Sequence, residues 1–139
     1  MISSCTDKNA EYEIQHMQIL GDAAPPKAEL TAFISLVRSV TEGDFATQRL
    51  PFSIEFKAKP FIVCGGGSAW GCSYTPSRMI VVAFANRCLG TSSVAHELFH
   101  IWLWDNFGDA DGNHTRTDLF VDADQEVANL ADDCVGGPL

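Results

Sequence analysis

Basic residues and long apolar runs are both scarce in this chain. Nine lysines and arginines stand against 18 aspartates and glutamates, which gives a net charge of −9 over 139 residues. The basic residues are scattered, and an acidic surface repels phosphate backbones, so we expect no nucleic-acid partner. No apolar run approaches the ~20 residues that cross a bilayer, so we expect no transmembrane segment. The length suits one ordinary domain.

The sequence also lacks an N-terminal apolar segment and any CxxC pair. Residues 1–13 contain no apolar core of a signal peptide, so an exported form would have lost its signal, and Cys5 would then resemble the lipid-bearing first residue of a bacterial lipoprotein. The missing CxxC disfavours a zinc ribbon. Five cysteines in so small a domain favour an extracytoplasmic location, whether periplasmic, secreted or lipid-anchored. The disulfides we expect are Cys64–Cys72 and Cys88–Cys134, with five buried free thiols as the alternative.

The apolar pattern predicts an α+β domain with an antiparallel or mixed sheet packed against helices. Helical periodicity and turn residues predict helices over 27–41, 92–106 and 118–133. Alternation and β-branched residues predict strands over 11–20, 52–56, 61–63, 70–74 and 79–85. We therefore expect a tail, a short strand and a linker over 1–24, and a single domain over 25–139.

Residues 91–102, TSSVAHELFHIW, contain the candidate metal-binding and catalytic residues. Thr91 or Ser92 can cap the start of a helix. His96 and His100 are then separated by about 400° of rotation, so both imidazoles project from one face, one turn apart. Two such imidazoles can reach one tetrahedral Zn²⁺. Glu97 lies about 100° round the helix, which suits a general base that takes a proton from a metal-bound water.

The same helix has an apolar stripe opposite the histidines. We expect this stripe to face the core, and it consists of Val94, Leu98, Ile101 and Trp102. A polar face on a buried helix is costly without partners, and a metal ion supplies a reason for the His-Glu-His set.

This pattern resembles the HExxH zinc metallopeptidases, the zincins, over residues 79–114. The variable positions are uncharged and contain no proline, and the strand over 79–85 precedes the helix as the family's upper edge strand does. The resemblance implies a small zincin-like domain whose edge strand binds an extended peptide and whose helix holds one zinc ion. It implies metalloendopeptidase-like hydrolysis of a peptide or protein, with Glu97 activating the water. The alternatives are a non-catalytic zinc-binding envelope or interaction domain, and histidines that bind no metal.

A catalytic zinc site needs a third protein ligand. His114, in the loop GDADGNHTR, is the leading candidate, although the spacing departs from HExxHxxGxxH because Leu103 and Asn106 replace its Gly and last His. The spacing is closer to SprT-like proteases, whose third His follows a longer loop. Glu126 is the rival, because QEVAN at 125–129 resembles the gluzincin signature with the Glu one position out of register. The remaining possibilities are an aspartate, namely Asp105, Asp109 or Asp111, or no third protein ligand.

Zincins often stabilise the oxyanion with a Tyr, His or Arg side chain. Tyr74, Arg78 and Arg87 are of the right type, but no spacing selects one of them. We expect each to have a structural role instead.

Overall fold

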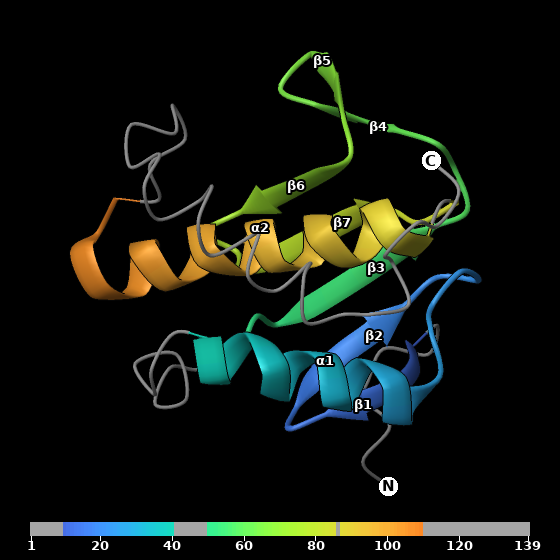
Figure 1. Cartoon of the computed structure of the whole chain (residues 1–139). Coiled ribbons are helices and arrows are strands. Elements are labelled where there is room, and N and C mark those ends of the chain that lie inside the picture. Colours follow the sequence, from blue (N-terminus) through green and yellow to red (C-terminus); the bar gives the residue numbers. More distant parts are fainter. Residues whose placement is uncertain (1–9, 41–49, 86, 110–139) are drawn as a thin grey trace, which may run out of the picture.

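The computed structural model describes residues 10–40, 50–85 and 87–109, and these form an α+β arrangement (Figure 1). The fold class expected from the sequence is therefore confirmed. The elements in chain order are β1 (Ala10–Ile14), β2 (Met17–Leu20), α1 (Lys27–Val40), β3 (Ser53–Lys57), β4 (Ile62–Cys64), β5 (Gly67–Ala69), β6 (Gly71–Tyr74), β7 (Met79–Ala83) and α2 (Arg87–Phe107).

The main sheet has five strands in the order β1-β2-β3-β7-β6 and is mixed. The neighbours β2 and β3 run parallel, as do β3 and β7, whereas β1 and β6 are antiparallel to the strands beside them. The expectation that the strand over 79–85 lies at the sheet edge is wrong. β7 lies between β3 and β6, and β6 is the edge strand. A central position suits β7, because Ile80 and Val82 are buried on one face of the sheet while Ala83 is buried and Val81 partly buried on the other.

The segment expected as one short strand over 11–20 is a hairpin of β1 and β2. Gln15 and His16 form its turn with φ of 47° and 73°. A turn with two positive φ values matches the twist of a hairpin, but it normally uses Asn or Gly, so the residues Gln and His do not predict it. The hairpin adds two strands to the main sheet. The division of the chain at residue 24 stays a prediction.

The core fills the space between one face of the sheet and the two helices (Figure 1). Strand register places Ile54 beside Ile80 and Phe56 beside Val82, and all four side chains are buried. α1 contributes buried residues at helical spacing: Leu30, Ile34 and Val37. Phe52, expected in the same alternation, lies before β3 and is 56% exposed.

The strands β4 and β5 form a separate small hairpin above β6 (Figure 1). A disulfide joins Cys64 of β4 to Cys72 of β6, so this part of the expected pairing is confirmed. Ile62 packs with Cys72 and Ala83, on the face of the sheet that Val81 also occupies. The hairpin is therefore held on the face opposite the helices. The proposed Cys88–Cys134 bond involves Cys134, which lies outside the described residues.

The second helix begins at Arg87, so the expected cap at Thr91 or Ser92 is wrong. These residues lie inside the helix, where Ser and Thr are only mildly unfavourable, and the buried turns that follow outweigh this cost. The helix ends as expected at Gly108, whose φ is 70° and whose N–H donates to the Trp104 carbonyl. Neither described helix is long and apolar enough to cross a membrane. The helix expected over 118–133 lies outside the described residues.

Candidate metal centre

The middle turns of α2 are buried on almost every side. The expected core stripe is present, since Val94, Leu98 and Ile101 are buried and Trp102 packs against the core. Further buried side chains lie outside this stripe: Ala95, Phe99 and Leu103. A helix that is buried all round normally carries only apolar residues. The polar residues among these turns therefore need a specific explanation.

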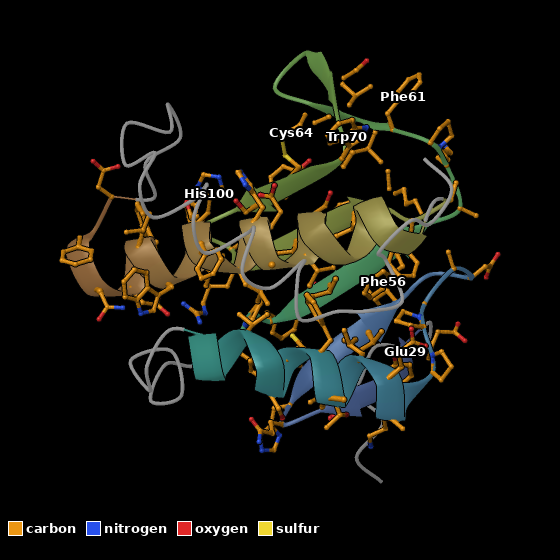
Figure 2. The ribbon with its side chains drawn as sticks, viewed as in Figure 1. Glu29, Phe56, Phe61, Cys64, Trp70 and His100 are labelled. Atoms are coloured by element: carbon orange, nitrogen blue, oxygen red, sulfur yellow. A yellow bond between two sulfur atoms is a disulfide. The ribbon has the colours of Figure 1, made fainter. Side chains whose placement is uncertain are left out.

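Three of those polar residues form a cluster: His96, Glu97 and His100. Glu97 is 6% exposed and His100 is 5% exposed, while His96 is partly buried. One ligand atom from each residue lies within 4.8 Å of the other two. Figure 2 shows His100 along the side of α2 that faces β6. The site predicted from HExxH thus lies at the junction of α2 with the edge strand.

The two imidazoles approach each other through their Nε2 atoms. These atoms are 3.2 Å apart, and the ring planes are inclined at 72°. Two nitrogens that each bind a tetrahedral Zn²⁺ at 2.0–2.1 Å are separated by roughly 3.3 Å. The observed separation therefore fits two neighbouring ligands of one ion without a change in backbone position. The donor set of two imidazoles beside a carboxylate also suits zinc.

Glu97 points toward β6, not toward the core stripe. A Cβ built on Gly71 of β6 would lie 3.0 Å from the Glu97 Cγ and 3.1 Å from its Oε2. The carboxyl group thus lies close both to the two histidines and to the backbone of the edge strand. A carboxylate in this position can accept a proton from a group held at the site.

The proposed third ligands have different outcomes. His114, Glu126 and Asp111 lie outside the described residues, so the structure does not test them. Asp105 forms an ion pair with Arg78 through its Oδ1 atom, and its side chain is 12% exposed. Asp109 is exposed, beyond the end of α2. Within the described residues, the structure therefore assembles His96, Glu97 and His100 without an additional ligand.

The structure describes the side chains of two of the three candidate oxyanion stabilisers, Arg78 and Tyr74. Arg78 occupies the turn before β7 with φ of 56°, and it bonds both Asp105 and the Leu50 carbonyl. This agrees with the expected structural role. Tyr74 is exposed at the end of β6. The side chain of Arg87 lies outside the described part.

Sequence reasoning did not identify Gly71 as a neighbour of the site. The only signal was a glycine within the strand predicted over 70–74, and an isolated strand glycine often marks a close approach. Which group approaches depends on how α2 packs on β6.

Comparison of the chain with protein-family models, with curated proteins and with solved structures gives no match.

Proposed function

We propose that this protein is a zinc-dependent hydrolase that cleaves peptide bonds. His96, His100 and His114 hold one zinc ion, and Glu97 acts as the general base. The observation that supports this proposal most strongly is the pair of Nε2 atoms 3.2 Å apart beside a buried carboxylate. Bound zinc would supply a water of lowered pKa and polarise the carbonyl that is attacked.

Each described residue has a separate role in the proposed reaction. The imidazoles of His96 and His100 bind through Nε2 and fix the position of the ion. Glu97 accepts a proton at a carboxylate oxygen from the attacking water and can return it to the leaving amine. Its burial keeps bulk water away from the carboxylate and strengthens its interactions with nearby charges.

The edge strand supports a peptide as the substrate. Within the described residues, β6 pairs with β7 on one side and ends the five-stranded sheet on the other. A free strand edge can bind an extended peptide through main-chain hydrogen bonds. β6 also lies directly against α2, since Gly71 borders the Glu97 side chain. A peptide added to this edge would run past the metal centre, as the zincin resemblance implies for the family's edge strand.

The Cys64–Cys72 disulfide supports action outside the cytoplasm. Disulfides persist in oxidising compartments such as the periplasm and the extracellular space. We therefore propose an extracytoplasmic site of action. Cys5, the proposed position of a lipid anchor, lies outside the described residues.

Metal analysis combined with a peptidase assay tests the proposal. Full-length protein without a His-tag should contain about one zinc per chain and should cleave an unfolded protein such as reduced casein. A chelator should abolish cleavage, and added Zn²⁺ should restore it. Glu97→Gln should keep its zinc and lose cleavage by roughly 10²- to 10⁴-fold. His100→Ala should lose both.

Two other outcomes would identify the alternatives. Zinc without chelator-sensitive cleavage would indicate a non-catalytic zinc-binding domain. Absence of zinc would mean that the two imidazoles interact only with each other and with the rest of the protein.

The third ligand is assigned by comparing His114→Ala with Glu126→Ala, because loss of a true ligand should weaken zinc binding strongly whereas the other substitution should not.

A further inference from the structure

We infer that Gly71 is a positioning residue: the edge strand comes so close to Glu97 that only a residue without a side chain leaves the carboxyl group in its place. The inference rests on the proposed function for its effect on catalysis, but the contact can be tested independently. Figure 2 shows Trp70, which precedes Gly71, and Cys64 beside the small β4–β5 hairpin, above α2 in this view.

The contact is specific to one side chain. The three heavy atoms nearest to a Cβ built on Gly71 all belong to Glu97: Cγ at 3.0 Å, Oε2 at 3.1 Å and Cδ at 3.4 Å. Distances of 3.0–3.1 Å are shorter than ordinary van der Waals contacts between such atoms. Any residue other than glycine would therefore displace Glu97 or β6.

The position of β6 is fixed from two directions. Its backbone pairs with β7, with Gly71 opposite Val82, and the Ala83 N–H donates to the Trp70 carbonyl at 2.8 Å. Cys72, the next residue, is bonded to Cys64 on the opposite face of the sheet. The strand therefore cannot easily move away from α2.

The backbone of Glu97 is fixed as well. Leu98 beside it is fully buried, and so are Ala95 and Phe99, each two positions away. Close packing at these positions prevents a shift of the helix without a large loss of contacts. The flexible part of the contact is the Glu97 side chain. A methyl group at position 71 should consequently move the carboxyl group by a few tenths of an ångström and leave the histidines in place.

Such a displacement should affect the rate more than substrate binding. Catalytic groups need placement within about 0.5 Å of the productive geometry, and misplacement by about 1 Å can cost 10²-fold in rate. Because the expected displacement is only a few tenths of an ångström, for Gly71→Ala we expect kcat to fall roughly 3- to 10-fold, with KM changed less than about twofold and zinc content unchanged.

Gly67→Ala is a matched control in the same part of the fold. It makes the same chemical change in β5, where the added Cβ would have no heavy atom closer than 4.0 Å. This control should leave kcat and the melting temperature close to those of the wild type. A general effect of replacing a strand glycine would change both variants equally.

A double-mutant cycle tests whether Gly71 acts through Glu97. Gly71→Ala should lower the melting temperature of the full-length wild-type protein, but not that of Glu97→Ala, where the opposing side chain is absent. Equal shifts in both backgrounds, or a kcat for Gly71→Ala that matches Gly67→Ala, would overturn the inference. If the wild type cleaves no peptide but the cycle shows coupling, the contact is established and the hydrolase proposal has failed separately.

Discussion

The two helices pack on the same face of the sheet, yet they differ in what they expose. α1 is amphipathic: Leu30, Ile34 and Val37 are buried, whereas Lys27 and Glu29 are exposed. In α2, every residue from 93 to 103 is buried or partly buried. The buried set in α2 nevertheless includes Glu97 and His100.

The two helices therefore make different contributions: α1 adds apolar contacts to the core, whereas α2 adds both apolar contacts and buried polar groups. α1 covers the sheet with one apolar stripe, which is the usual way in which a helix contributes to a core. α2 covers the sheet and also encloses polar groups whose burial is costly unless they have partners. Replacing buried charged groups with apolar residues is often neutral or stabilising, so the presence of Glu97 and His100 supports the proposed metal site.

The largest effect should come from core truncation in α2. Phe99 is fully buried, so Phe99→Ala should lower the free energy of unfolding by about 3–5 kcal/mol. Phe33 of α1 is only partly buried, and Phe33→Ala should cost clearly less. Urea denaturation followed by fluorescence measures both variants. Equal losses would remove the contrast between the helices.

A smaller effect is expected where the end of α2 is attached to the sheet. Arg78 bonds Asp105 in the last turns of α2, and both side chains are mostly buried. Arg78→Ala leaves a buried carboxylate without its partner and should cost roughly 3 kcal/mol. In an Asp105→Asn background the same substitution should cost much less. Additive losses measured by denaturation would show that the pair contributes nothing beyond packing.

The smallest effect concerns the start of α1 and appears only at high pH. Tyr12 donates a hydrogen bond to the Pro25 carbonyl just before α1, and burial, with help from Glu11, raises the pKa of its phenol from 10.0 to about 12. Between these values the unfolded chain loses this proton while the folded protein keeps it. The contribution of this group to stability should therefore be constant below pH 10 and should be lost as the pH rises toward 12.

Tyr12→Phe is the control for this pH dependence. It should lose about 1 kcal/mol at neutral pH, because the hydrogen bond is absent. Its stability should then fall less steeply than that of the wild type between pH 10 and 12. Parallel curves from denaturation at a series of pH values would contradict the assigned role of Tyr12.

Local patterns predicted the elements better than their arrangement. The helix expected over 27–41 is α1, Lys27–Val40, because its apolar spacing is strong and prolines precede it. The strand over 79–85 was predicted from its β-branched residues, but its place beside β3 depends on contacts with distant parts of the chain. The turn at Gln15 and His16 was missed because neither residue commonly adopts positive φ.

The sequence by itself determined the spacing of His96, Glu97 and His100, because helical geometry alone places residues four apart on one face. It also suggested the Cys64–Cys72 bond. Only the tertiary structure decided that β6 is the edge strand and that Gly71 borders the Glu97 carboxyl group. Contacts between segments far apart in the chain depend on how complete surfaces pack, and no local pattern of residues specifies that packing.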